Sequence, residues 1–453
     1  MKDLAIVICN YNKVEYLKEC LHSISNAVFE NYSKDIIVVD NLSNDGSADM
    51  IEKHFPDVIL IRNNENSGGA GGFAKGMQYA LDHGYRYVSL LDNDTKVEKN
   101  NFINLIKHLN DDSSIGVAGS TILQMDNPQN VQEVGAMLDW ENYILKLNYK
   151  DFNIENPIIP QQIECDYVPA CCLMTTGEVL QKAGIFDRDY FIYLDDIDWC
   201  TRVKDLGYKI VAFKDSLVWH KGGAKIATNT MYHYYYYRNM TRFFLKNISP
   251  DKLEHFINEV SSKISKMMFF ANLKGQTSSV RSMLIGIDDA YAKRLGAQWS
   301  GIYPKKEAAN KIYELSSTKQ DILIIDNIDS VDFQQTIVNI RMHTDAKITV
   351  LAKYLEFEYV SSILDNIDNA YATKEIGDLS EYDMVIQSVE HITNYKDYDE
   401  CGAYIDAFGN CIADDADKIN VQSYGSFMTM FDNITKPVLQ HKFTTLFKEL
   451  NIK

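Results

Sequence analysis

The chain has 453 residues, which at about 150 residues per domain corresponds to two or three domains. Hydrophobic residues make up 46% of the chain and charged residues 24%, so the composition is globular and excludes a disordered, collagen-like or coiled-coil protein. The net charge is −18, and a bulk charge of that sign repels nucleic-acid phosphates, so we expect no nucleic acid among the partners.

The eight cysteines are scattered and form no CxxC pair, and two of them, Cys171 and Cys172, are adjacent. This spacing favours neither a disulfide framework nor a zinc site, and reduced, buried thiols point to the cytosol. The apolar run LAIVIC (4–9) is short and follows Asp3, so we expect a first strand there rather than a signal peptide. No window approaches the roughly 18 apolar residues of a membrane span. We therefore expect a cytoplasmic protein, with attachment to the inner face of the membrane left open.

Strand and helix patterns alternate through residues 1–120. Short apolar runs predict strands over 4–9, 35–40, 58–63 and 87–94. Helical periodicity separates them, with helices expected over 14–24 and 72–83. Such alternation predicts a parallel sheet built from βαβ units.

The pattern changes in the middle of the chain. Residues 121–165 are irregular, a helical pattern begins at Val179, and a helix over 197–206 precedes strands expected over 209–213 and 216–220. Residues 230–315 are mainly helical, and the stretch 221–281 holds ten Lys/Arg against three acidic residues. A basic interfacial helix on anionic lipid is one interpretation. Core-packing helices with solvated lysines are the alternative.

From residue 316 onward the chain is acidic, with 23 Asp/Glu against 11 Lys/Arg, and the βα rhythm restarts. Strands are expected over 321–326, 347–353 and 382–387, with helices near 332–341 and 355–367. We predict three parts: an α/β catalytic domain over 1–230, a helical region over 231–315, and a smaller accessory α/β Rossmann-like domain over 316–453. Asp326 ends a strand of the last part, where a turn role is sufficient. Oligomerisation, acceptor handling and partner docking stay open as its function.

Acidic residues stand at the ends of two strands of the first domain. Asp40 closes IIVVD, and Asp92 and Asp94 close VSLLDND. Ligands of open parallel sheets bind outside these carboxyl ends. Both aspartates of the Asp-x-Asp pair project to the same side of an extended chain, so two hard oxygens can converge on Mg²⁺ or Mn²⁺. A cap or turn role is the alternative for any single carboxylate.

The segment NSGGAGGFAKG (66–76) is rich in glycine. It matches neither GxGxxG after the first strand nor GxxxxGK[ST], so nicotinamide dinucleotide and P-loop chemistry are disfavoured. Its glycines let the backbone come close to a ligand, and the helix that follows offers N-terminal amides. A flexible loop is the alternative interpretation.

A second acidic group, Asp195, Asp196 and Asp198, crowds the start of a predicted helix. The helix dipole stabilises anions there, and mutual repulsion can raise one pKa towards that of a general base. His220 lies 24 residues after Asp196, behind a short strand. A lone histidine is usually structural, so its assignment depends on the wider pattern.

Taken together, these segments resemble the family 2 inverting glycosyltransferases with a GT-A fold. The resemblance covers roughly residues 3–245, and its motifs keep a specific order and spacing. They are IVICNYNK, IIVVDNLSNDGS (36–47), NSGGAGGF (66–73), LLDND (90–94), YLDDIDWCTR (193–202), VWHKGG (218–223) and YYYYRN (234–239). The set is most similar to bacterial galactofuranosyltransferases and rhamnosyltransferases.

The resemblance implies a nucleotide-diphospho-sugar site and a divalent cation, Mn²⁺ or Mg²⁺. Asp92, Asp94 and His220 would ligate the cation, and Asp196 would be the catalytic base with Asp195 beside it. The remaining donor-site residues that it implies are Asn10, Tyr11 and Asp40 at the nucleobase and ribose, Gly68, Gly69, Gly71, Gly72 and Phe73 at the diphosphate, Asp92 and Asn93 in the Asp-x-Asp turn, and Trp199 against a sugar. Asn93 departs from the third acid that galactofuranosyl relatives often carry.

The implied reaction inverts the anomeric carbon in one displacement. The base removes a proton from an acceptor hydroxyl, and the cation neutralises charge on the departing diphosphate. The adjoining Asp195–Asp196 pair and the spacing to His220 favour UDP-galactofuranose as donor, with dTDP-rhamnose as the alternative. The resemblance suggests a bacterial surface polysaccharide, such as a cell-wall or capsule glycan, or a lipid-linked precursor as the acceptor.

Two other classes of function stay open. A nucleotidyltransferase would need a triphosphate-binding motif near the first strand, and we find none there. A non-catalytic nucleotide-sugar binding protein would need a broken base or metal site. Peripheral membrane association and formation of homo-oligomers are further open points about partners.

Overall fold

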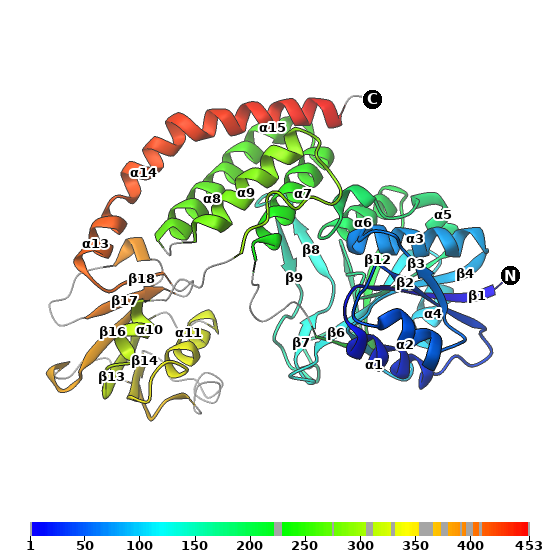
Figure 1. Cartoon of the computed structure of the whole chain (residues 1–453), viewed down its shortest axis with the longest axis horizontal. Helices are drawn as coiled ribbons and strands as arrows, with labels where there is room; N and C mark the ends of the chain where they lie inside the picture. Colours follow the sequence, from blue (N-terminus) through cyan, green and yellow to red (C-terminus); the bar gives the residue numbers. More distant parts are fainter. Residues whose placement is uncertain are drawn as a thin grey trace. The chain divides into compact units, whose positions relative to one another are not determined.

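The computed structural model describes residues 2–221, 229–273, 276–304, 311–327, 331–352, 366–372, 379–389, 392–395, 402–406 and 410–451. The chain forms two compact units (Figure 1). Unit 1 comprises Met1–Glu259, Ser282–Tyr303 and Lys442–Lys453, and unit 2 comprises Val260–Arg281 and Pro304–His441. The boundaries at residues 230 and 315 stay a prediction.

Unit 1 is built on a ten-stranded sheet in the order β10-β12-β6-β11-β4-β1-β2-β3, with β5 paired to β12 and β7 to β6. A separate hairpin joins β8 and β9. The strands are β1 (Lys2–Asn10), β2 (Lys34–Asp40), β3 (Ile59–Arg62), β4 (Tyr85–Asp92), β5 (Thr95–Val97), β6 (Ile115–Gln124), β7 (Val131–Glu133), β8 (Ala136–Asp139), β9 (Ile144–Leu147), β10 (Gln162–Cys165), β11 (Cys172–Thr176) and β12 (Lys209–His220).

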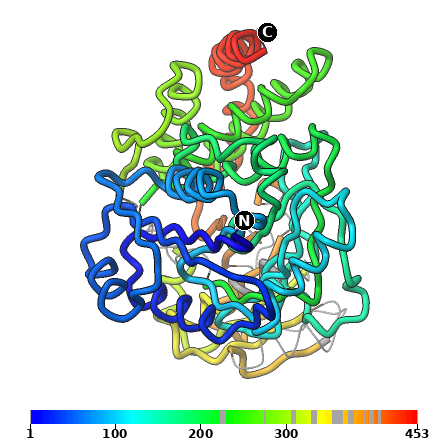
Figure 2. The backbone as a smooth tube through the Cα atoms, turned by 90° about the vertical axis from the view of Figure 1, so that its right-hand side faces the viewer, coloured from blue at the N-terminus to red at the C-terminus, as the bar shows by residue number. Residues whose placement is uncertain are grey.

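The parallel part of this sheet is the one that the sequence predicts. Strands β4, β1, β2 and β3 are parallel neighbours, with Ile6 opposite both Ile36 and Ser89. Strand β1 therefore lies inside the sheet, and the first strands can be followed as the blue trace in Figure 2. The predicted GT-A-type α/β fold is confirmed.

Strand β11 interrupts the parallel arrangement. It runs antiparallel between β4 and β6, and β6 then pairs in parallel with β12. The two strands expected over 209–213 and 216–220 are one strand, β12, whose register against β6 shifts between Phe213 and Leu217. Beyond the shift β12 pairs with β6 again, and the two strands end together with His220 opposite Gln124.

Helices cover both faces of the sheet (Figure 1). On one face, Leu17 and Leu21 of α1 and Phe102 of α4 pack on Ile6 and Leu91 in one buried cluster. The other face carries α3, α5 and α6. The helices of unit 1 and its borders are α1 (Val14–Ser25), α2 (Ser47–His54), α3 (Gly68–Asp82), α4 (Asn101–Asp111), α5 (Gly177–Ala183), α6 (Asp195–Asp205), α7 (Met231–Asn247), α8 (Leu253–Leu273), α9 (Thr277–Tyr291) and α15 (Lys436–Leu450), with short 3₁₀ turns at Arg188–Tyr190 and Pro250–Lys252.

The helical region expected over 230–315 is present as α7, α8 and α9 in the described part of the chain. Phe243, Phe244 and Leu245 of α7 are buried inside unit 1, as the core-packing interpretation requires. No helix in the described ranges is both long and apolar enough to cross a membrane.

Unit 2 carries its own parallel sheet in the order β15-β14-β13-β16-β17-β18, of which only the β17–β18 pair is antiparallel. Ile322 and Ile324 of β13 and Val350 of β14 lie in its core. The helix expected near 355–367 falls largely outside the described residues. The elements are α10 (Lys311–Ser316), β13 (Asp321–Asp326), α11 (Val331–Arg341), β14 (Lys347–Ala352), β15 (Asn369–Ala372), β16 (Met384–Val389), β17 (Ala403–Asp406), β18 (Cys411–Ile412), α13 (Asp415–Gln422) and α14 (Tyr424–Met430), with 3₁₀ turns at Leu379–Glu381 and Ile392–Asn394 and a π-helical turn at Phe431–Thr435.

Candidate active site

The Asp-x-Asp turn and His220 meet because β5 connects the ends of two strands. Strand β4 ends at Asp92, and β5 starts at Thr95, directly after Asp94. Strand β5 pairs antiparallel with β12, which places His220 opposite Thr95. His220 Nε2 is then 3.2 Å from Asp94 Oδ1 and 3.6 Å from Asp92 Oδ2. The structure thus brings together the three side chains for which the sequence predicts cation binding.

The charges in this cluster act strongly on one another. The pKa of Asp92 is raised to about 6, by burial first and then by the charges of Asp94 and Asp196, with His220 opposing the shift. Burial lowers the pKa of His220, but Cys171, Asp94 and Asp92 together bring it well above its ordinary value. A cluster of this kind, rich in negative charge, favours a cation.

Cys171 is a member of the cluster that the sequence does not single out. Its thiol lies with one carboxylate oxygen of Asp92 and one ring nitrogen of His220 in a group whose atoms are all within 4.8 Å of one another. Cys171 precedes β11, whose antiparallel pairing sets Cys172 opposite Leu91. That pairing joins residues far apart in sequence, so no local pattern could have placed the thiol there.

Asp195 and Asp196 open α6 and are held close to this cluster. Asp196 Oδ2 accepts a hydrogen bond from the backbone N–H of Ala170 at 3.1 Å, one residue before Cys171. Burial raises the pKa of Asp196 to about 6, while hydrogen bonds from the amides of Ala170 and Ile197 oppose the shift. Burial, followed by the charge of Asp196, raises the pKa of Asp195 well above its usual range. A carboxylate with a pKa near 6 suits a general base.

The loop before α6 has an unusual backbone. Phe191, Tyr193 and Leu194 all have φ between 63° and 67°, in the left-handed region that few non-glycine residues adopt. Such conformations persist only where the surroundings fix them. The loop delivers Asp195 and Asp196 directly, so its geometry sets the position of both carboxylates.

Arg238 and Asn239, the end of the YYYYRN motif, hold that loop. Arg238 is fully buried and donates to the backbone oxygens of Asp189 (3.0 Å), Tyr190 (2.8 Å) and Gly296 (2.7 Å). The Asn239 amide donates to the backbone oxygens of Tyr190 (2.9 Å), Ile192 (2.8 Å) and Tyr193 (3.0 Å). The motif therefore has a backbone-clamping role on α7, which its sequence alone does not reveal.

The predicted nucleotide-binding residues at the ends of β1 and β2 are linked by hydrogen bonds. Asn10 is fully buried, and its amide donates to Asp40 Oδ1 at 2.9 Å and to Ser43 Oγ at 3.1 Å. Asn93 Nδ2 in turn donates to Asn10 Oδ1 at 2.7 Å. Tyr11 follows with 46% of its surface exposed. One network thus connects the ends of β1, β2 and β4.

The glycine-rich segment forms the first turns of α3, and close packing explains two of its glycines. Gly68 has φ +70°, and a Cβ there would lie 2.1 Å from the carbonyl oxygen of Phe191. At Gly72 a Cβ would lie 2.3 Å from Cys9 Sγ. Among the remaining predicted diphosphate residues, Gly71 and Phe73 are also buried, whereas a Cβ on Gly69 would meet open space. The segment packs α3 against β1 and against the loop before α6.

Two residues near Asp196, namely Asp198 and Trp199, are buried and paired with other groups of the protein. Trp199, expected against a sugar, is fully buried, and its Nε1 donates to the Gly184 carbonyl at 2.7 Å. Asp198 is 1% exposed and pairs with Arg202 at 3.0 Å and with Lys246 at 2.7 Å. These partners distinguish Asp198 from the two aspartates before it.

Glu133 at the end of β7 is a further acidic group that the sequence does not single out. It is 6% exposed, and its Oε1 has no hydrogen-bond partner within the described ranges. Its pKa is raised to about 8, by burial first and then by the charge of Asp196, with His220 opposing the shift. The pairing of β7 with β6 buries this carboxyl within reach of the electrostatic field of the candidate site.

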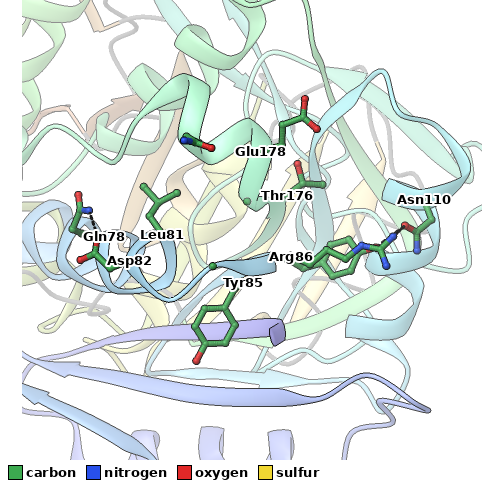
Figure 3. A pocket seen from close by; sticks show the side chains of 12 residues that line it. Gln78, Leu81, Asp82, Tyr85, Arg86, Asn110, Thr176 and Glu178 are labelled. Atoms are coloured by element: carbon green, nitrogen blue, oxygen red, sulfur yellow. Dashed lines mark hydrogen bonds between the residues drawn. The ribbon is translucent and has the colours of Figure 1, made fainter. Parts of the chain in front are cut away.

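A cavity of about 790 Å³ lies at the opposite end of β4, lined by Tyr85, Arg86, Thr176 and others (Figure 3). Two pairs of its polar side chains are joined by hydrogen bonds. Gln78 donates to Asp82 at 2.8 Å, and Arg86 donates to Asn110 at 3.1 Å. The cavity is separated from Asp92 by the length of β4, so it takes no part in the candidate active site.

The sequence model described as "Glycosyl transferase family 2" matches residues 5–176. The matched segment runs from β1 to the end of β11 and is less than half of the chain. It contains Asp92, Asp94 and Cys171, whereas Asp196 and His220 lie beyond its end.

A curated relative of this chain is the low-salt glycan biosynthesis hexosyltransferase Agl10 of Haloferax volcanii, which is 24% identical over 208 residues. The match covers 45% of this chain and 62% of the relative, so the chain spans less than two thirds of that relative's length.

Two solved structures are similar at low identity. They are the mannosyltransferase PcManGT from Pyrobaculum calidifontis in complex with GDP-Man and Mn²⁺ (16% identity, TM-score 0.40, 66% of this chain and 76% of that chain) and S. aureus TarS 1–349 (14% identity, TM-score 0.39, 65% of this chain and 82% of that chain).

Proposed function

We propose that the protein is a metal-dependent inverting glycosyltransferase that moves a hexosyl group from a nucleotide-diphospho-sugar to a hydroxyl of a glycan acceptor. One observation carries the proposal: in a chain whose residues 5–176 match the glycosyl transferase family 2 model, the cluster of Asp92, Asp94 and His220 forms near Asp196, a buried carboxylate whose pKa is raised to about 6. Asp196 is tied closely to the cluster, because it accepts a hydrogen bond from the backbone N–H of Ala170, and Ala170 is next in sequence to Cys171, a member of the cluster.

In this proposal Asp196 is the general base. Its Oδ1 and Oδ2 accept hydrogen bonds from the backbone N–H groups of Ile197 and Ala170, which fix the orientation of the carboxylate. It would remove the proton of an acceptor hydroxyl while that oxygen attacks the anomeric carbon, so that configuration inverts without a covalent intermediate. The pKa of Asp195, buried beside it, is raised well above its usual range by burial and by the charge of Asp196, so Asp195 would hold its proton in preference to Asp196.

The donor set of the cluster fits a divalent cation. Asp92 and Asp94 offer hard oxygens and His220 an imidazole nitrogen, a combination suited to Mn²⁺ or Mg²⁺. A bound cation would neutralise negative charge on the leaving diphosphate. Gln132 Nε2 lies 3.0 Å from His220 Nδ1. For His220 to bind through Nε2, the Gln132 amide would turn its oxygen to Nδ1–H and so orient the ring.

The donor stays a choice between two nucleotide sugars. UDP-galactofuranose is favoured by the adjoining Asp195–Asp196 pair and its spacing to His220, and dTDP-rhamnose is the alternative. Hexosyl transfer in glycan biosynthesis is supported by the relative Agl10, which is named for that role. We place the acceptor among bacterial surface glycans or their lipid-linked precursors.

The proposed setting is the cytoplasm. Attachment to the inner membrane face would place the protein beside a lipid-linked acceptor, and of the apolar side chains in the basic stretch 221–281, Phe243 and Phe244 are buried. Flotation with anionic vesicles tests this attachment, and sedimentation of the purified chain tests whether it forms homo-oligomers.

Calorimetric titration of the full chain with UDP and with dTDP, each with and without Mn²⁺, tests the donor site. Tight, Mn²⁺-dependent binding of UDP alone would support the galactofuranosyl reading. Preference for dTDP would replace UDP-galactofuranose by dTDP-rhamnose, with the same residues in the same roles. If folded protein binds neither nucleotide, the proposed function is wrong. Pyrophosphate release from a nucleoside triphosphate would instead identify a nucleotidyltransferase.

A further inference from the structure

The thiol of Cys171 stands among side chains that bind metals. It forms one compact group with a carboxylate oxygen of Asp92 and a ring nitrogen of His220, all three atoms within 4.8 Å of one another. Two ligand atoms at about 2.1–2.3 Å from one ion can be at most about 4.5 Å apart. The group therefore needs to close by only a few tenths of an ångström to share one cation.

The backbone fixes Cys171 in this position. The amide of Asp92 donates to the carbonyl of Cys171 at 3.2 Å, which ties the residue to the end of β4. On its other side, Sγ lies 3.4 Å from the hydroxyl of Thr95, the residue paired with His220 across β5 and β12. Three strands thus hold the sulfur beside the Asp-x-Asp turn.

The other buried cysteines near the sheet have different neighbours. Cys172 accepts a hydrogen bond from Ser120 at 3.2 Å, and the thiols of Cys20 and Cys165 each lie 3.7 Å from a backbone carbonyl, that of Asp92 and that of Ile210. Among the cysteines in the described ranges, Cys171 alone belongs to a group of three metal-binding side chains.

We propose that Cys171 is an inner-sphere sulfur ligand of the cation held by Asp92, Asp94 and His220. The bond that forms joins the metal to Sγ, the S–H bond breaks, and the proton leaves to solvent, with no change of oxidation state. A thiolate is a soft ligand, so the site would discriminate against Mg²⁺ in favour of Mn²⁺, Co²⁺, Zn²⁺ and Cd²⁺. This inference rests on the cation site of the proposed function and extends it to the class of metal.

Cobalt substitution tests the sulfur ligand directly, without any turnover. Reduced full-length protein is titrated with Co²⁺ under anaerobic conditions while the near-ultraviolet spectrum is recorded. We expect a sulfur-to-cobalt charge-transfer band that saturates at one equivalent. The band should be lost in Cys171→Ser and kept in the matched control Cys172→Ser, and Asp92→Asn should weaken cobalt binding. Cobalt binding without the band, or a band that survives in Cys171→Ser, overturns the inference.

A second measurement covers a Cys171→Ser variant that fails to fold. Cys171→Ala is then used, with near-ultraviolet circular dichroism as the check on folding. Competition titrations compare Cd²⁺ with Mg²⁺, and we expect the preference for Cd²⁺ to fall by about tenfold or more, the range over which even outer-shell changes alter metal affinity. An unchanged preference contradicts sulfur ligation.

The two proposals fail in different ways. Mn²⁺-dependent glycosyl transfer with no cobalt–sulfur band would leave the enzyme in place and remove Cys171 from the coordination sphere. A saturating band in a protein that binds no nucleotide would establish the metal site and remove the transferase.

Discussion

Two parallel sheets in this chain end in aspartates, and their surroundings differ. In unit 2, Asp326 ends β13 and accepts a hydrogen bond from Ser388 at 3.0 Å. Asp406 ends β17 and accepts from the amide N–H of Ile392 at 3.2 Å and of Asn410 at 2.9 Å. In unit 1, Asp92 ends β4 and instead faces Asp94 and His220, with 37% of its side chain exposed.

The difference teaches what makes a strand-end carboxylate reactive. Asp326 and Asp406 stabilise loops because neutral donors satisfy them. Asp92 stands beside Asp94 and His220, and burial together with the charges of Asp94 and Asp196, opposed by His220, raises its pKa to about 6. The aspartates of both units thus lie at the ends of parallel strands. The kind of partner decides whether such a carboxylate stabilises a turn or belongs to a functional site.

The largest expected effect comes from Asp196→Asn. It removes the proposed base while keeping the shape of the side chain, so transfer should fall by about a thousandfold, within the range for general-base catalysis. The same change at the other sheet, Asp326→Asn, keeps an oxygen for Ser388 and should leave turnover unchanged. Steady-state transfer assays measure both. Full activity in Asp196→Asn, with nucleotide binding intact, would show that Asp196 matters no more for turnover than Asp326 does, and would remove it as the base.

The substitution Arg238→Met tests how much the hydrogen bonds of Arg238 to the loop before Asp195 contribute to stability. The carbonyls of Asp189 and Gly296 would lose the Arg238 donor, and that of Tyr190 would keep only Asn239, so the free energy of unfolding should fall by about 3 kcal/mol. All four tryptophans of the chain, at 140, 199, 219 and 299, lie in unit 1, so their fluorescence during urea unfolding reports on that unit.

The matched control for Arg238 is Arg62→Met. Arg62 is half exposed and pairs with Glu52 at 2.7 Å, so its loss should change stability by less than about 1 kcal/mol. Equal effects of the two arginine changes would mean that the clamp adds nothing to the loop.

The acid limb of the pH profile is the next smaller effect. Asp196 acts as a base only when deprotonated, and its pKa is raised to about 6. Activity should therefore rise with pH up to about 6 and then level off, falling about tenfold per pH unit below that point. Rates are compared with nucleotide binding measured at the same pH. A rate that stays constant down to about pH 4 would exclude Asp196 as the titrating base.

Much of the fold and part of the site could be predicted because their signals are local. The apolar runs at 4–9 and 35–40 became β1 and β2, and the Asp-x-Asp motif marked its own strand end. His220 joined it only because β5 pairs with β12, yet the motif order of the family was enough to suggest that.

The rest of the site depends on pairings between distant residues. Glu133 and Cys171 enter through β7 and β11, antiparallel strands whose register no local pattern specifies. Trp199, a motif residue expected against a sugar, is buried and packs beside Asp198. Sequence thus identifies the chemistry at strand ends better than the surroundings that tune it.

The smallest effect concerns Glu133, a buried carboxyl whose Oε1 finds no hydrogen-bond partner among the residues that the structure describes. Its pKa is raised from 4.5 to about 8 on folding. The folded chain therefore binds more protons than the unfolded chain between these two values, and the wild type loses stability as pH rises through that window. Glu133→Gln cannot ionise, so in metal-free buffer near pH 8 it should be more stable than wild type by about 1–2 kcal/mol.

The exposed Glu164 on β10 offers the control Glu164→Gln, which should change nothing. Tryptophan-monitored urea unfolding at several pH values measures all three proteins. If the free energy of unfolding of Glu133→Gln depends on pH as that of wild type does, Glu133 is already ionised in the folded chain. The acidic surroundings that distinguish this end of the unit 1 sheet from that of unit 2 would then act on Glu133 less strongly than its burial implies.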